Sequence, residues 1–255
     1  MAFVIGFAGK GGTGKTTISA LTVRYLMEKK KKAVLAVDAD SNSCLNEALG
    51  VEIYATIGRL REESLATVRS GAERPGGMSM EQLFDYQVQQ SVIESKGFDL
   101  MVMGRPEGPG CYCAANNIIR KYTDILSDKY PYVVIDNEAG MEHLSRRTTH
   151  SVDLLLIISD PTQKGVQTAY RINGLVDELE LDVKERRFII NRVSDENFSK
   201  LKKSSAVLPE DKLYHIPNDE NIFHLDMEGK PVFDLPQDSV AVTTFYEILD
   251  SCNIP

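Results

Sequence analysis

The fold of this 255-residue chain is decided by the stretch Gly9-Lys10-Gly11-Gly12-Thr13-Gly14-Lys15-Thr16-Thr17. It follows an apolar run, residues 3–8, and precedes a segment of helical periodicity, so it forms a strand-to-helix turn. Its spacing fits the phosphate-binding pattern G-x-x-x-x-G-K-[ST]. Glycines let backbone N–H groups turn toward a phosphate, Lys15 reaches the β and γ phosphates, and the Thr16 hydroxyl ligates Mg²⁺. The nine residues are therefore predicted to bind a nucleoside triphosphate.

The same stretch also satisfies the dinucleotide pattern G-x-G-x-x-G, and Asp38 lies where such a fold places its ribose-binding acid. A dinucleotide site has no use for a cation and a hydroxyl directly after the third glycine. A Mg-triphosphate site needs both, so Lys15 and Thr16 favour the triphosphate.

The composition bounds the possible partners and the size of the fold. The chain is 42% hydrophobic and 26% charged, which is ordinary for a soluble globular protein, and its length suits one domain over residues 1–255. A formal charge of −8 argues against nucleic acid or an anionic membrane as the main partner. Because the sequence shows neither a bilayer-spanning apolar run nor a secretory leader, we expect a cytoplasmic protein.

Short apolar runs alternate with helical patterns along the chain, which predicts an α/β fold. We expect a doubly wound, mostly parallel sheet of seven or eight strands with helices on both faces. The expected strands are residues 2–7, 33–37, 100–103, 132–135, 154–158, 187–190 and 213–215. The expected helices are residues 15–29, 54–68, 80–94, 114–126 and a core-packing C-terminal run, 239–252.

Acidic residues end two of these strands, and strand carboxyl ends face the ligand in a doubly wound sheet. Asp38 and Asp40 follow the second strand and are predicted to lie near the phosphates, although capping of the next helix would explain either one. Asp136 ends an apolar strand, as a Mg²⁺-site carboxylate does in phosphate-loop enzymes, with helix capping as the alternative. Gly140 follows and can bring its N–H to the γ phosphate as a switch.

Polar residues after the last two strands are candidates for binding the adenine base. Asn191, followed by Arg192, carries an amide that both donates and accepts. Pro217 and Asn218 occupy the equivalent position one strand later, where they would also suit a simple turn.

The four cysteines do not form a disulfide framework in a chain of this length. Cys111 and Cys113 stand in a Gly/Pro-rich loop ahead of a helix and are predicted to lie near the surface. Two thiolates are half of a four-donor site for a thiophilic divalent metal, and a two-fold dimer would supply the other half. Incidental cysteines or a redox pair are the alternatives, and Cys44 and Cys252 are expected to be small buried residues.

Lys10 adds a second lysine to the loop, and this resembles the deviant Walker A loop of the family that includes nitrogenase iron protein, the Min-system ATPases, ParA and the arsenite-pump ATPase. The resemblance implies a Mg²⁺-dependent ATPase that binds ATP and ADP and forms a homodimer. It implies that Lys10 crosses the dimer interface to the partner's nucleotide and that Asp40 positions or activates the attacking water. With Lys15, these are the expected catalytic residues.

Four motifs together resemble the nickel-inserting maturation ATPases of carbon monoxide dehydrogenase, the CooC type, and a close relative that serves acetyl-CoA synthase. They are the loop, Asp38-x-Asp40-x-x-x-Cys44-Leu45, Cys111-x-Cys113 and Asp136-x-x-Ala139-Gly140-x-Glu142-His143-Leu144. The resemblance implies that Cys111 and Cys113 of two chains hold one Ni²⁺ or Zn²⁺ for one of those client enzymes. Both cysteines fall in one tripeptide, unlike those of nitrogenase iron protein, which argues against a 4Fe–4S cluster.

Two other functions fit the same loop. One is a positioning ATPase of the ParA or MinD kind, although the C-terminal run lacks the cationic face that an anionic membrane would attract. The other is an amide-forming enzyme of the cobyrinate or dethiobiotin synthetase type.

Overall fold

The computed structural model describes residues 2–70, 77–105, 112–138, 151–204 and 208–255. Its centre is an eight-stranded sheet in the order β3-β4-β2-β5-β1-β6-β7-β8. Every neighbouring pair is parallel except β3 and β4. The strands are β1 (Phe3–Gly9), β2 (Val34–Ala39), β3 (Ile93–Glu94), β4 (Phe98–Val102), β5 (Tyr132–Asn137), β6 (Ser151–Ser159), β7 (Asp182–Asn191) and β8 (Leu213–Ile216).

The expected doubly wound α/β architecture is confirmed, and each of the seven predicted strands is present. The eighth, β3, was not predicted, and the expectation of helix through residue 94 is wrong at that end. Ile93 and Glu94 instead pair with Leu100 and Asp99 in an antiparallel ladder. Two residues are too few to show a strand periodicity, so only the tertiary partner reveals this strand.

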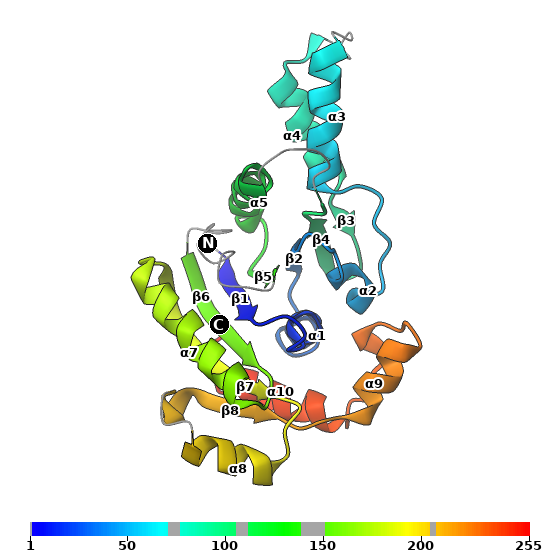
Figure 1. Cartoon of the computed structure of the whole chain (residues 1–255). Coiled ribbons are helices and arrows are strands. Elements are labelled where there is room, and N and C mark those ends of the chain that lie inside the picture. Colours follow the sequence, from blue (N-terminus) through cyan, green and yellow to red (C-terminus); the bar gives the residue numbers. More distant parts are fainter. Residues whose placement is uncertain (1, 71–76, 106–111, 139–150, 205–207) are drawn as a thin grey trace.

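Helices cover both faces of the sheet (Figure 1). They are α1 (Lys15–Tyr25), which continues as a π-helical turn (Leu26–Lys30), α2 (Leu45–Leu49), α3 (Ile57–Ser70), α4 (Met80–Gln90), α5 (Tyr112–Ser127), α7 (Gln163–Glu178), α8 (Asp195–Ser204), α9 (Glu220–Met227) and α10 (Val240–Asp250). Short 3-10 turns span Glu210–Lys212 and Val232–Asp234. Among the described residues, no helix is long and apolar enough to cross a membrane.

Alternation along the strands divides the core between the two faces. On β1, Ile5 and Phe7 pack with α1 and α10, whereas Val4 packs on the opposite side with α3 and α5. The rest of that second side is covered by α7 and α8. Helix α10 buries Val242, Phe245 and Leu249 in the first cluster, as expected from the sequence, whereas Val240 at its first position is exposed. Helices α3 and α4 extend beyond the sheet as a projecting pair (Figure 1).

Candidate functional site

The loop between β1 and α1 has the backbone conformation of a phosphate cradle. Gly9 and Gly14 both have positive φ, 154° and 91°. A Cβ at Gly9 would lie 2.3 Å from the carbonyl oxygen of Ile158, and one at Gly14 would lie 2.5 Å from the Asn191 amide nitrogen. Gly14 also stands at the N-cap of α1, where no side chain caps the helix. The first N–H groups of α1 therefore remain available to an anion.

Lys15 supplies a buried cation at this loop. The side chain is mostly enclosed, and its Nζ donates to the carbonyl oxygen of Lys10 at 3.4 Å. Burial lowers the pKa of Lys15, while the carboxylates of Asp136, Asp40 and Glu138 act in the opposite direction. A cation surrounded by acids but held by a neutral carbonyl can turn toward a polyphosphate, which is a stronger partner.

Asp136 ends β5 next to the start of α1, and it is 2% exposed. Its carboxylate accepts hydrogen bonds from Ser19 Oγ, at 3.0 Å, and from the Thr16 side chain. Burial raises the pKa of Asp136 to about 6, against the opposing effect of Thr16, Ser19 and Lys15. A hydroxyl and a carboxylate side by side are the oxygen donors that Mg²⁺ takes, so Thr16 and Asp136 fit the predicted magnesium site.

Asp38, predicted to lie near the phosphates, ends β2 among backbone donors. It is completely buried, and its two oxygens accept from the backbone N–H groups of Asp40 and Leu45, both at 3.0 Å. Burial raises its pKa to about 7. Asp38 therefore holds the loop that follows β2 and the first N–H of α2, as in the capping alternative, while its predicted place in the nucleotide site stays a prediction.

Asp40 lies on that loop, half-buried, beside the phosphate cradle. Its carboxylate accepts from the backbone N–H of Asn42 at 2.8 Å and from the Asn42 side chain at 3.1 Å. Ser41 donates to Glu138 at 3.3 Å, which joins this loop to the end of β5. The register opposes Asp38 and Asp136, so the two acidic strand ends lie on adjacent strands.

A cavity of about 480 Å³ opens beside the loop, which is in the usual range for a site that encloses a small ligand. Gly14, Thr16 and Thr17 line one wall, and the predicted base-binding residues Asn191, Arg192, Pro217 and Asn218 line the other. The structure therefore brings both predicted groups to one cavity.

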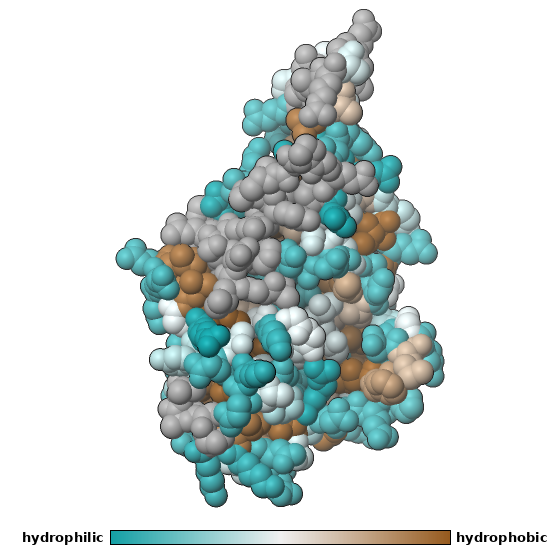
Figure 2. All heavy atoms as spheres, in the orientation of Figure 1, coloured by the Kyte–Doolittle hydropathy of each residue, from teal (hydrophilic) through white to brown (hydrophobic). Residues whose placement is uncertain are grey.

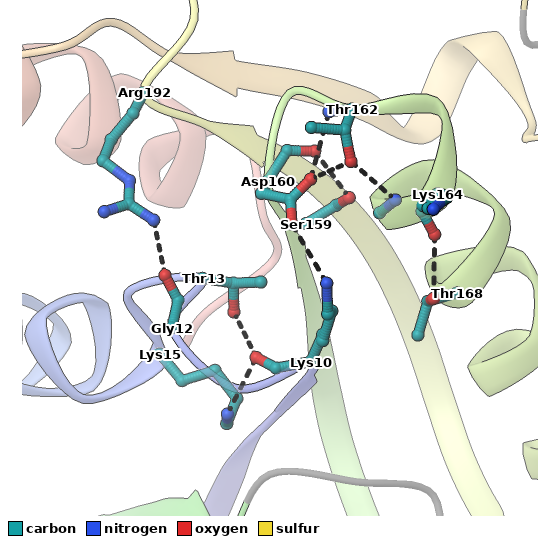
Figure 3. A network of polar contacts seen from close by, with 11 residues as sticks. Lys10, Gly12, Thr13, Lys15, Ser159, Asp160, Thr162, Lys164, Thr168 and Arg192 are labelled. Atoms are coloured by element: carbon teal, nitrogen blue, oxygen red, sulfur yellow. Dashed lines mark hydrogen bonds and ion pairs between the residues drawn. The ribbon is translucent and has the colours of Figure 1, made fainter.

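Asn191 and Arg192 hold the loop as well as facing the cavity. The Asn191 amide nitrogen donates to the carbonyl oxygen of Thr13 at 2.8 Å. The Arg192 guanidinium donates to the carbonyl oxygen of Gly12 (Figure 3). The bond to Thr13 uses one of the two N–H groups of the Asn191 amide, whose nitrogen carries two donors and whose oxygen can accept. The predicted role, in which the amide both donates to and accepts from a base, stays a prediction.

Lys10 points away from Lys15, toward the end of β6 (Figure 3). Its Nζ lies 3.9 Å from Asp160 Oδ2, and its side chain is 55% exposed. Asp160 also accepts from the backbone N–H and the hydroxyl of Thr162, the N-cap of α7. The sequence interpretation missed Asp160, although it follows an apolar strand in the same way as Asp136.

Two predicted residues lie outside the described residues: Cys111 of the metal site and Gly140 of the γ-phosphate switch. Cys113 of the metal site is described only as backbone in the first turn of α5. In the parts of the chain that the structure describes, no group of three or more His, Cys, Asp or Glu side chains could hold a metal ion.

The two remaining cysteines differ from each other. Cys252 is buried, as expected. Cys44 is exposed and lines the cavity, so the expectation of burial is wrong for it, because it stands at the N-cap position of the short helix α2 instead of packing beneath a helix.

This sheet, loop and acidic strand ends define a P-loop ATPase. The profile of the CobQ/CobB/MinD/ParA nucleotide-binding domain matches residues 4–232, and the chain belongs to that family. An uncharacterised ATP-binding protein of Methanocaldococcus jannaschii is 39% identical over 97% of both chains. The carbon monoxide dehydrogenase accessory protein CooC of Rhodospirillum rubrum is 33% identical over 91% of this chain and 89% of its own. The septum site-determining protein MinD of Pyrococcus horikoshii, solved with Mg-ADP, shares the fold with a TM-score of 0.67 at 20% identity, covering 98% of this chain and 97% of that one.

Proposed function

We propose that this ATPase is a metallochaperone, which carries Ni²⁺ or Zn²⁺ between two copies of the chain and delivers it to carbon monoxide dehydrogenase or acetyl-CoA synthase. The observation that carries the proposal is the Cys111-x-Cys113 motif in a chain that is 33% identical to a carbon monoxide dehydrogenase accessory protein. Four thiolates from two chains make a complete tetrahedral site for a thiophilic divalent ion.

ATP is the proposed nucleotide, and Thr16 and Asp136 would hold its Mg²⁺. The metal would neutralise charge on the phosphates, as Mg²⁺ does in phosphoryl transfer. Lys15 and the N–H groups at the start of α1 bind the phosphates, and Asp40 orients the attacking water. The Mg-ADP in the related MinD fold supports this assignment. The position of Asp38, whose backbone contacts set the conformation of the loop, supports a fixed place for Asp40.

Lys10 connects hydrolysis with the dimer in this proposal. In the single chain its ammonium group lies at the exposed edge of the loop, in a long ion pair with Asp160. Such an exposed pair contributes little, so the lysine can exchange Asp160 for the phosphates of a partner chain. ATP binding then favours the closed dimer, and closure brings the two Cys-x-Cys motifs together. Coupling requires ATP to bind the closed state better than the open one.

The decisive measurement is metal stoichiometry with and without a nonhydrolysable ATP analogue, combined with light scattering. We expect one Ni²⁺ or Zn²⁺ per two chains, appearing together with the dimer. The double variant C111S/C113S should lose the metal and keep ATP binding. C44S is the matched control, since it removes a thiol outside the motif and should keep the metal. A double variant that still binds one metal ion per dimer would contradict the assignment.

The same protein distinguishes the other two functions. Helix α10 buries Phe245 and Leu249, which leaves these side chains unavailable to a lipid surface. We therefore expect no cosedimentation with anionic liposomes, whereas a positioning ATPase of the MinD kind would sediment. An amide-forming enzyme would show an ATPase rate raised severalfold by a small carboxylate substrate, and we expect no such stimulation.

A further inference from the structure

Much of the cavity wall that faces the phosphate loop is built by the segment that leaves the sheet after β8, beside Asn191 and Arg192 at the end of β7. This segment contributes Pro217 and Asn218, then Ile222 on α9, and finally Ala241 at the start of α10. The two ends of this segment, Pro217 and Ala241, are far apart in sequence, so tertiary contacts must hold them together.

Helix α9 is weakly anchored by packing. None of its eight residues is buried, and only Ile222 and Leu225 pack partly against the core. Two further apolar side chains of α9 are largely exposed, Phe223 at 62% and Met227 at 71%, although Phe223 also lines the cavity. Figure 2 shows apolar surface at the place of α9, on the lower right of the molecule. Hydrophobic burial alone is small for such a helix, so its position depends on other contacts.

Asp219 provides those contacts. Its Oδ1 accepts from the backbone N–H of Asn221 at 2.9 Å, in the first turn of α9. Its Oδ2 accepts from Ser239 Oγ at 2.6 Å and from the backbone N–H of Ala241 at 3.0 Å, at the start of α10. One carboxylate thus joins the N-terminal ends of two helices, where the helix dipoles favour a negative charge.

The environment keeps Asp219 ionised although it is only 7% exposed. Burial opposes ionisation, but the hydrogen bonds from Ser239, Ala241 and Asn221 outweigh it, so the pKa of Asp219 lies below its ordinary value. Asp219 lines the cavity, but both of its oxygens are engaged by protein donors. We therefore expect its main effect on a ligand to pass through Pro217 and Asn218, the two residues before it, which line the cavity as well.

We propose that Asp219 is a positioning residue of the nucleotide site, which fixes the base-binding loop and α9 against α10. The proposal rests on the nucleotide occupying this cavity. Thr16 lines the opposite wall at the start of α1, where it is hydrogen-bonded to Asp136 on β5 and follows Lys15 in the chain. Loss of Asp219 therefore loosens the base end of the cavity and leaves the chemistry at the phosphate end intact.

The test compares D219A, D219N and S239A with the wild type, at a temperature where each variant is folded by circular dichroism. Binding of a fluorescent ATP analogue gives Kd, and steady-state hydrolysis gives KM and kcat. D219A should raise Kd and KM about tenfold, the size expected when a helix cap shared by two helices is lost. Its kcat should stay within about twofold of the wild type. D219N, which keeps one acceptor oxygen, should fall between D219A and the wild type.

S239A removes one of the three donors and should raise KM in the same direction by a smaller factor. If D219A does not fold, S239A still tests whether Asp219 positions the base-binding loop. E220Q is the matched control, because Glu220 is an exposed carboxylate one residue further on that does not line the cavity. It should behave as the wild type.

Three results would overturn the proposal. A lower melting temperature with unchanged KM in both D219A and S239A would make Asp219 merely structural. A fall in kcat with unchanged KM would place it in the chemistry. If the wild type hydrolyses ATP and D219A binds ATP equally well, the ATPase activity would stand and the positioning role of Asp219 would be refuted. Failure of the wild type itself to bind ATP would instead refute the nucleotide site.

Discussion

The two ends of the nucleotide cavity are built in different ways. The phosphate end stands on β1, β2 and β5 in the middle of the sheet, where each functional group lies within a few residues of a buried strand. The base end stands on β7, β8 and the weakly buried α9 at one edge. The groups at the phosphate end therefore take their positions from buried central strands, whereas those at the base end depend on the contacts that join the starts of α9 and α10.

The first prediction tests the phosphate end, where the largest effect is expected. K15M removes the buried cation while keeping an apolar stem of similar length. Because the ammonium group stabilises charge on the transferring phosphoryl group, kcat/KM should fall about a hundredfold or more. Phosphate release assays measure this. K29M is the matched control, since Lys29 lies on the far turn of the same helix and does not line the cavity. An equal loss of kcat/KM in K15M and K29M would contradict the role given to Lys15.

The second prediction concerns the buried Asp38, whose pKa is about 7 in the folded chain against 3.8 as the ordinary value. The folded state therefore holds a proton that the unfolded state has released between those two pH values. Stability associated with Asp38 is present below about pH 4 and declines as pH rises toward 7, with a slope of about 1.4 kcal/mol per pH unit for one proton. Urea unfolding of the nucleotide-free protein measures this slope.

D38N tests the assignment of that slope. The variant cannot ionise, so its free energy of unfolding should change less steeply between pH 4 and 7 than that of the wild type. Asp136, whose pKa is about 6, contributes in the same direction and remains in the variant. An unchanged slope in D38N would show that another group carries the proton.

The third prediction has the smallest expected effect and concerns Lys10. D160N removes the negative charge opposite Lys10 but keeps an oxygen that can accept from Thr162. Because an exposed ion pair contributes only a few tenths to one kcal/mol, the ATP-dependent dimer should form about two- to fivefold more readily. Light scattering across a concentration series measures this. D177N, which breaks an exposed ion pair with Arg186 away from the loop, should leave the dimer unchanged; weaker dimerisation in D160N would contradict the role given to Asp160.

The sequence predicted those parts of the molecule in which one local pattern indicates both a secondary-structure element and the candidate functional residues beside it. The loop from Gly9 to Thr17 and the buried strand before Asp136 combine an apolar run with polar residues at a fixed offset. Asp160 also follows an apolar strand, but it was not among the predicted site residues. Strand β3 shows no strand pattern in the local sequence, because only its pairing with β4 defines it as a strand.

Other outcomes depend on three-dimensional neighbours that spacing does not reveal. Asp38 and Asp40 are alike in sequence, yet one carboxylate is enclosed by backbone donors and the other reaches the loop surface. Cys44 was expected to be buried because cysteine usually is, but the residue is exposed at the N-cap position of α2 and lines the cavity. The role of Asp219 required knowing that the starts of α9 and α10 meet, which are separated by about twenty residues.

The contacts from Asn191 and Arg192 to the carbonyl oxygens of Thr13 and Gly12 have a consequence for the cost of binding. A glycine-rich loop is the segment that loses most conformational entropy when it closes around a ligand. Here the end of β7 already holds the loop in its curled form, so most of that ordering occurs when the chain folds. Nucleotide therefore meets a rigid receptor, and variants at Asn191 should slow association by restoring freedom to a loop whose own residues are unchanged.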